Sequence, residues 1–327
     1  MGLTGRLAAP VIQRVSDLRV PRLELRHLYF VALWLVTSVL FWPPLKILAL
    51  LVIQDERYSH IAVVPLISAA LLWLKRHTLM TEKHYCPTTG APLIALGLLV
   101  NLAARARLPI SDSLSLSVFA LLLTWTGVFI CCFGLGSLTA ASFPFAFLLW
   151  MVPLPGKVLE GMVTILQAGS ASASYFLMRL AGVPVLRNGL ILGLPNVDIE
   201  VARQCSGVRS AISLFMTGTF IAQLLLRSTW KKLVLITCIV PVLILKNAMR
   251  IVCISILGVY VNRGFLFGNL HRYGGLPFSL VGLAMLLPLL WMLWRSEQGG
   301  MDKSSRRLPR TEHGSYSPES GASILRS

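Results

Sequence analysis

The feature that most constrains this chain is the repetition of long apolar runs along almost its whole length. Such runs recur between Tyr29 and Trp294, separated by short polar connectors. A helix of about 20 mostly apolar residues is enough to cross the hydrocarbon of a bilayer. Of the 327 residues, 55% are hydrophobic and 13% are charged, whereas a soluble domain carries about 25% charged residues. The sequence therefore predicts an all-α polytopic membrane protein.

We expect about eight transmembrane helices, with both ends of the chain in the cytoplasm. Residues 1–26 are predicted to be a basic cytoplasmic leader, residues 27–295 a single transmembrane domain and residues 296–327 a disordered cytoplasmic tail. The first span is expected to be bent or broken near Pro43 and Pro44, because proline interrupts helices. The expected spans are residues 28–53, 61–74, 91–104, 114–133, 138–152, 205–226, 233–261 and 276–294.

Two segments outside these spans have distinct patterns. Residues 156–181 look helical, but polar residues and a run of small residues dilute their apolar character, so we expect an interfacial or re-entrant helix rather than a full crossing. Residues 183–201 alternate apolar and polar residues around the turn signals Asn188-Gly189 and Pro195-Asn196. This alternation predicts a small β-hairpin outside the membrane, just before Cys205.

The formal net charge of +17 would suggest a nucleic-acid partner for a soluble protein. Here the basic residues concentrate in the leader, in the connectors at 75–76 and 227–232, and in the tail, as in cytoplasmic loops of membrane proteins. We therefore expect the lipid bilayer as a partner and no nucleic acid. The six cysteines show no CxxC motif and no metal-ligand spacing with histidines, so we expect no metal and no cofactor.

Cys205 differs from the other cysteines, which we expect to be packing residues. It lies where an extended segment gives way to a helix. The positive end of the helix dipole, with Arg203 and Arg209 nearby, favours a thiolate and hence a nucleophile. The alternative is a packing cysteine beside a helix capped by Ser206.

Two further polar positions accompany Cys205. Asn247 and Arg250 are three residues apart and so share a helix face; Arg250 is either a structural ion-pair partner or a donor to a substrate carbonyl or oxyanion. His271 lies in the loop before the last span, where it is either incidental or a general base and acid. The predicted topology brings Cys205, Arg250 and His271 to one face of the membrane, an arrangement suited to thiol acyl transfer.

Three strings in this order, RQCSGVRS at 203–210, NAMRI at 247–251 and HRYGG at 271–275, resemble the signature of the exosortase and archaeosortase family. The segments 55–60 and 149–155 agree with it. The resemblance implies a multi-pass enzyme of the bacterial inner membrane, with its active site on the periplasmic or external face. It would recognise C-terminal sorting signals of the Pro-Glu-Pro (PEP-CTERM) type on exported proteins, cleave them, and transfer the new carboxyl end to an acceptor such as a polysaccharide or lipid.

The resemblance also implies residue roles. Cys205 would be the nucleophile of this cysteine peptidase or transpeptidase, Arg250 the ligand of the carbonyl or transition state, and His271 the acid and base. Supporting or substrate-contacting roles are implied for other residues, with ion pairing as the alternative for Glu200 and a simple interfacial position for His60. These supporting residues are Asn247, Ser206, Glu200 and His60.

The alternative function is a non-catalytic membrane transporter, or an assembly factor for surface polysaccharide, in which Arg250 and His271 bind an anionic substrate. Paired broken helices in two similar halves would favour transport, and the sequence shows no internal repeat. The HExxH and GxSxG motifs of other hydrolases are missing from the sequence, as are the P-loop and GxGxxG fingerprints of nucleotide binding.

Overall fold

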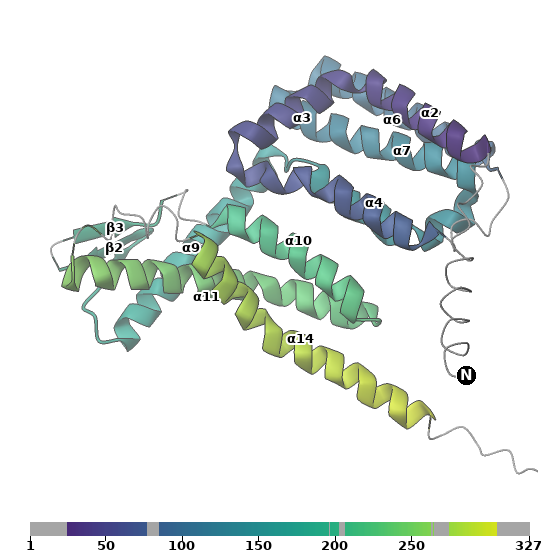
Figure 1. The fold of residues 1–327 in the computed structure, drawn as a ribbon. Helices are drawn as coiled ribbons and strands as arrows, with labels where there is room; N and C mark the ends of the chain where they lie inside the picture. Colours follow the sequence, from purple (N-terminus) through teal and green to yellow (C-terminus); the bar gives the residue numbers. More distant parts are fainter. Residues whose placement is uncertain are drawn as a thin grey trace, which may run out of the picture.

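The computed structural model describes residues 25–76, 85–195, 197–202, 207–262, 264 and 275–305. Most of these residues are helical, and one small antiparallel sheet accompanies the helices (Figure 1). Within the described ranges, six helices are long and apolar enough to cross a membrane, and the number rises to eight if each of two bent helix pairs is one span. The predicted all-α polytopic class is therefore confirmed.

The first span is broken where the sequence predicts it. Helix α2 (Leu25–Leu40) and helix α3 (Trp42–Gln54) meet at 77°. Two prolines follow the first residue of α3, near the helix start, where a missing N–H costs little. The chain then turns through a 3₁₀ helix, η1 (Glu56–Ala62), into α4 (Val64–Leu74).

The next two helices form a hairpin, and the segment that follows them is broken into short helical pieces. Helix α6 (Pro87–Arg107) packs along α7 (Ile110–Ala140), which leaves helical geometry at Gly134, where φ is 83°. The kink at Gly134 falls between the expected spans 114–133 and 138–152. The expected span 138–152 consists of short pieces, α8 (Ser142–Leu148) and the 3₁₀ helix η2 (Leu149–Met151). Pro144 disfavours a continuous helix here because it lacks an N–H.

These short pieces run antiparallel to α4. Lys75 Nζ donates to Ala140 O at 2.8 Å, and Ser68 Oγ donates to Pro144 O at 2.8 Å. Ser68 comes before Lys75 in the chain, whereas its partner Pro144 comes after Ala140. The two segments therefore run in opposite directions. This pairing returns the chain to η1, so that η1 and η2 lie together at one end of the bundle.

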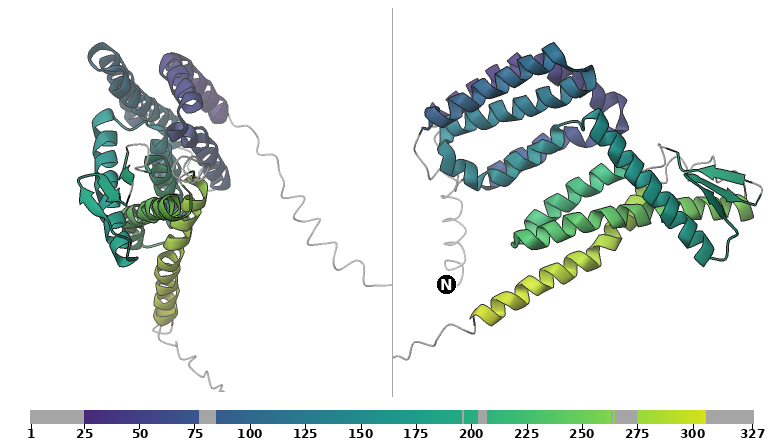
Figure 2. Two further views of the ribbon diagram at one scale, coloured as in Figure 1. Left: turned by 90° about the vertical axis from the view of Figure 1, so that its left-hand side faces the viewer. Right: turned by 180° about the vertical axis from the view of Figure 1, so that it is seen from behind.

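Helix α9 (Gly156–Leu180) leaves the bundle at a sharp angle. It makes an 85° bend with the segment Ser142–Met151, and it projects with the sheet to one side of the bundle (Figure 2). One face of α9 packs on a later helix, whereas Ile165, Phe176 and Leu180 on it are exposed. A bend of this kind occurs both in a broken span and in a re-entrant loop, so the interfacial or re-entrant character of residues 156–181 stays a prediction.

The predicted hairpin is present and carries a third strand. Strands β1 (Leu186–Asn188), β2 (Ile191–Leu194) and β3 (Val197–Glu200) form an antiparallel sheet in sequence order. Gly189, with φ of 62°, provides the tight turn between β1 and β2. The inner side chains Leu192 and Leu194 are buried.

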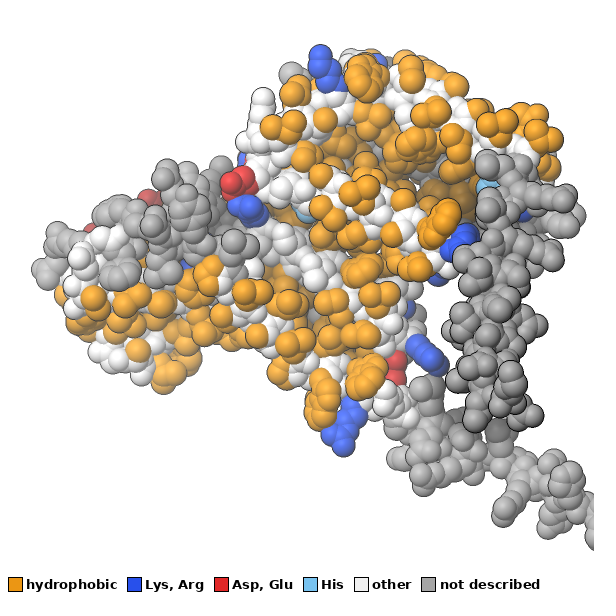
Figure 3. All heavy atoms as spheres, viewed as in Figure 1, with side chains coloured by type: hydrophobic (Ala, Val, Ile, Leu, Met, Phe, Trp, Pro, Cys, Tyr) orange, Lys and Arg blue, Asp and Glu red, His pale blue; other side chains and the backbone are white. Residues whose placement is uncertain are grey.

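Three long helices complete the fold: α10 (Val208–Leu225), α11 (Thr229–Tyr260) and α14 (Gly275–Ser305). The helical backbone of α14 continues past residue 296, the expected start of the disordered tail. The second half of α11 extends beyond α10 and runs beside α9 (Figure 1). Apolar side chains cover much of the face drawn in Figure 3, as expected for helices that contact lipid.

Candidate functional site

The start of α10 is the point where the polar contacts of the C-terminal helices meet. Gly207 precedes the helix with a left-handed backbone, φ 73°. A Cβ atom on Gly207 would lie 3.2 Å from Asn247 Oδ1 on α11. Glycine is therefore suited to this position both by its backbone angle and by the close approach of the neighbouring helix.

A buried polar cluster joins α9, α10 and α11 beneath this point. Asn247 and Ser170 are 2% and 0% exposed, and Asn247 Nδ2 donates to Ser170 Oγ at 2.9 Å. Lys246 Nζ donates to Ser210 Oγ, which in turn donates to Gly207 O at 2.8 Å. Lys246 thus ties the first turn of α10 to α11, and its neighbour Asn247 ties α11 to α9.

The chain that leads to α10 is also fixed on its other side. After β3, Val201 is buried; its N–H donates to Leu190 O at 3.0 Å and its carbonyl accepts from Gln167 Nε2 at 2.7 Å. Both Val201 and Gln167 are at least nine-tenths buried. The residues on both sides of the segment 203–206 are therefore anchored, by α9 on one side and by α11 on the other.

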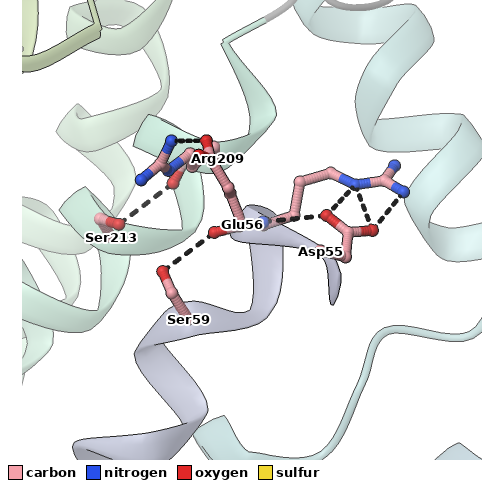
Figure 4. Close-up of polar contacts among 6 residues, drawn as sticks. Asp55, Glu56, Ser59, Arg209 and Ser213 are labelled. Carbon is pink, nitrogen blue, oxygen red and sulfur yellow. Dashed lines mark hydrogen bonds and ion pairs between the residues drawn. The ribbon is translucent and has the colours of Figure 1, made fainter. Parts of the chain in front are cut away.

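An ion pair links the front of α10 to η1. Arg209 Nη1 contacts Glu56 Oε2 (Figure 4), and both side chains are exposed. Such exposed pairs contribute at most about 1 kcal/mol. Beside it, Asp55 accepts from the backbone N–H of Arg57 at 3.0 Å and binds its guanidinium at 2.6 Å. These hydrogen bonds from Arg57 lower the pKa of the Asp55 carboxyl.

A small cavity of about 240 Å³ lies between η1, η2 and α10. Its wall is mostly apolar, with His60 and Tyr58 as its residues from η1 and Ile212 as its residue from α10. His60 Nδ1 lies 3.1 Å from Arg57 O. The remaining lining residues are Leu149, Trp150, Val152 and Leu154.

The structure brings together some of the predicted site residues. Asn247 is buried against Gly207, and Arg250 is half-buried three residues later on the same helix. His60 lines the cavity beside α10, whereas Glu200 ends β3 with an exposed side chain on the projecting sheet. Glu200 is therefore not brought to the cavity. Three other predicted residues, Cys205, Ser206 and His271, lie outside the described residues.

Several contributing residues were not predicted. Lys246 immediately precedes the string NAMRI at 247–251, and a lysine in an apolar helix is itself a signal of function. Ser170 lies in the small-residue run of α9, where only the packing against α11 reveals its partner. The sequence around Gln167 does not indicate its hydrogen bond with Val201, because that contact depends on the tertiary fold.

The fold and this site define a multi-pass membrane protein with a buried polar cluster at the start of one of its helices. The model of a protein family described as transmembrane exosortase matches residues 52–288. This match spans well over half of the chain, and the protein belongs to the transmembrane exosortase family. Searches of curated proteins and of solved structures returned no match.

Proposed function

We propose that this exosortase is a membrane-embedded cysteine peptidase and transpeptidase that cleaves C-terminal sorting signals of the Pro-Glu-Pro type from exported proteins. Its site would face the external side of the bacterial inner membrane, and the acceptor would be a polysaccharide or lipid of the cell surface. Family membership supports this function. The observation that carries it is the contact between Gly207, two residues after Cys205, and the α11 face that includes Asn247.

The proposed reaction begins with attack of the Cys205 thiolate on the carbonyl carbon of the scissile peptide bond. A carbon–sulfur bond forms, and the electron pair moves to the carbonyl oxygen. When the tetrahedral intermediate collapses, the C–N bond breaks and protonated His271 gives its proton to the leaving amine. Water or the hydroxyl or amine of an acceptor then attacks the thioester, His271 takes the proton of the attacking group, and the carbon–sulfur bond breaks to release the Cys205 thiolate.

Arg250 is the proposed donor to the oxyanion. A guanidinium offers several N–H donors in a fixed plane and stays charged at any working pH. Such a donor accelerates the reaction only if it is held in place before charge develops. Asn247, one helical turn away and fixed by Ser170, supports this rigidity of the α11 face.

The transporter alternative draws support from broken helices, and the described chain has two bent pairs. These pairs differ in construction. The first joins helices of 16 and 13 residues, whereas the second joins a short segment that ends in a 3₁₀ turn to a helix of 25 residues. They are not copies of one repeat. These two pairs therefore do not provide the paired broken helices in two similar halves that would favour transport.

The proposed function is tested by a cleavage assay in cells that express an exported reporter with a Pro-Glu-Pro-type C-terminal signal. Cys205→Ala is expected to leave the reporter at full length, while the wild type shortens it. Cys253→Ala is the matched control, because Cys253 is an exposed cysteine on α11 that the proposed reaction does not use. Continued shortening with Cys205→Ala would rule out Cys205 as the nucleophile.

A further inference from the structure

Lys246 is a buried cation for which the proposed reaction gives no role. Its side chain is 3% exposed and lies on α11, one of the helices long and apolar enough to cross the membrane. No ion pair found among the described residues includes it. Ionisable side chains at membrane depth are costly and mark functional positions, so the position of this ammonium requires an explanation.

The contacts of Lys246 direct its ammonium to the start of α10. Its methylene stem packs against α14 at Gly282, where a Cβ atom would lie 3.1 Å from Lys246 Cδ. The Nζ atom donates to Ser210 Oγ, and the Ser210 hydroxyl donates to Gly207 O. A short chain of hydrogen bonds therefore connects the ammonium to the residue that precedes α10.

Among the residues that the structure describes, the charges around this point are mainly positive. Arg250 lies four residues after Lys246 on the same face of α11, and two like charges at this spacing repel each other. Arg209 on α10 is paired with Glu56 of η1, so that carboxylate is already engaged. The amino end of α10 adds the positive end of its dipole. The contact at α14 is a glycine, Gly282, which brings no charge.

A positive site of this kind favours an anion, and burial strengthens its effect because the local dielectric is low. A purely structural role does not explain a lysine here. An apolar side chain of similar volume would fill the same space without the free-energy cost of burying a charge. The groups that become anionic in the proposed reaction are the thiolate and the carbonyl oxygen.

We propose that Lys246 is a positioning residue of the exosortase site, whose buried ammonium holds the first turn of α10 through Ser210 and favours the anionic form of the nucleophile that precedes this turn. This inference rests on the proposed function, because it takes Cys205 as that nucleophile. Lys246 itself need not touch the substrate.

The test measures the alkylation of Cys205 by N-ethylmaleimide in the full-length protein, followed by mass spectrometry across a pH series. Lys246→Met removes the charge and keeps most of the volume. We expect it to slow alkylation at pH 7 about tenfold, which corresponds to a thiol pKa about one unit higher. Lys232→Met is the matched control, since Lys232 lies near the other end of α11 and binds Gln223; it should leave the rate unchanged.

Thermal unfolding of the same variants separates this role from packing. Lys246→Met is expected to keep or raise the melting temperature, because a buried charge is removed. A lower melting temperature with a wild-type alkylation profile would overturn the proposal. Ser210→Ala is the second variant: it keeps the charge but breaks the hydrogen-bonded link, and it should slow alkylation by a smaller factor. A Ser210→Ala profile identical to the wild type would overturn the link through Ser210.

The alkylation readout does not require cleavage activity. Failure of the proposed function would appear as cleavage that survives Cys205→Ala in the reporter assay. Failure of the Lys246 proposal would appear as an unchanged thiol profile in Lys246→Met. The two outcomes are therefore distinguishable.

Discussion

Gly207 is the residue whose replacement tests the candidate site most locally. Its left-handed backbone strains any residue with a Cβ, by about 1–2 kcal/mol, and the added atom would press on Asn247. We expect Gly207→Ala to lower both the melting temperature and the cleavage of a reporter. The measurement is thermal unfolding in detergent together with the reporter assay.

The matched control for Gly207→Ala is Gly182→Ala. Gly182 also has a positive φ, 74°, but a Cβ there would meet nothing within 4 Å. Its substitution should cost similar stability from backbone strain while cleavage continues. Equal loss of cleavage in both variants would show that general destabilisation, and not the contact with Asn247, is responsible.

The position of a site residue could be predicted from the sequence where it depends on nearby residues in the chain. The shared face of Asn247 and Arg250 follows from helical spacing alone, and the structure has both on the continuous helix α11. The contacts of Lys246 with Ser210, and of Asn247 with Ser170, join residues distant in the chain. Helix periodicity does not reveal such partners, because they depend on how whole helices pack.

At the scale of elements, helix α9 supports the site through buried hydrogen bonds, one with Asn247 and one with the carbonyl of Val201. Gln167→Leu would remove the donor to Val201 O and leave that buried carbonyl without this partner, at a cost of about 1–3 kcal/mol. Because Val201 leads toward Cys205, we expect weaker cleavage of the reporter and a lower melting temperature. The melting temperature is measured on the purified variant, and cleavage of the reporter is measured in cells.

Thr164→Val on the same helix is the comparison. The Thr164 hydroxyl is exposed and donates only to Glu160 O, within its own helix. Wild-type cleavage and a nearly unchanged melting temperature are expected for this variant. If Gln167→Leu behaved as Thr164→Val does, the anchoring role of α9 would be wrong.

Helices and strands were predictable where the apolar runs are long or where the turn residues are distinctive. The break at Pro43 and Pro44 and the strands around Gly189 follow from residue chemistry. The third strand and the fragmentation of 138–152 into α8 and η2 were not predicted. The third strand depends on pairing with β2, and the place of α8 and η2 depends on packing against α4. The local sequence encodes neither contact, although Pro144 disfavours a continuous helix.

At the scale of the whole molecule, the basic connectors and the candidate site occupy opposite ends of the bundle. Lys75 binds Ala140 at one end, and Arg227 and Ser228 donate their backbone N–H groups to Glu297 after α10. The ion pair of Glu56 with Arg209 marks the start of α10, at the other end of that helix (Figure 1). The positive-inside rule therefore supports the proposal that the basic end is cytoplasmic and the candidate site is external.

The central claim, an activated cysteine on the external face, is tested most directly by labelling intact cells with a membrane-impermeant maleimide across a pH series. The wild type is compared with Cys205→Ala. We predict labelling that localises to Cys205, with an apparent pKa below the ~8.5 of a free thiol. Labelling of Cys205 only after permeabilisation would contradict the external site, and labelling only after denaturation would contradict an activated nucleophile.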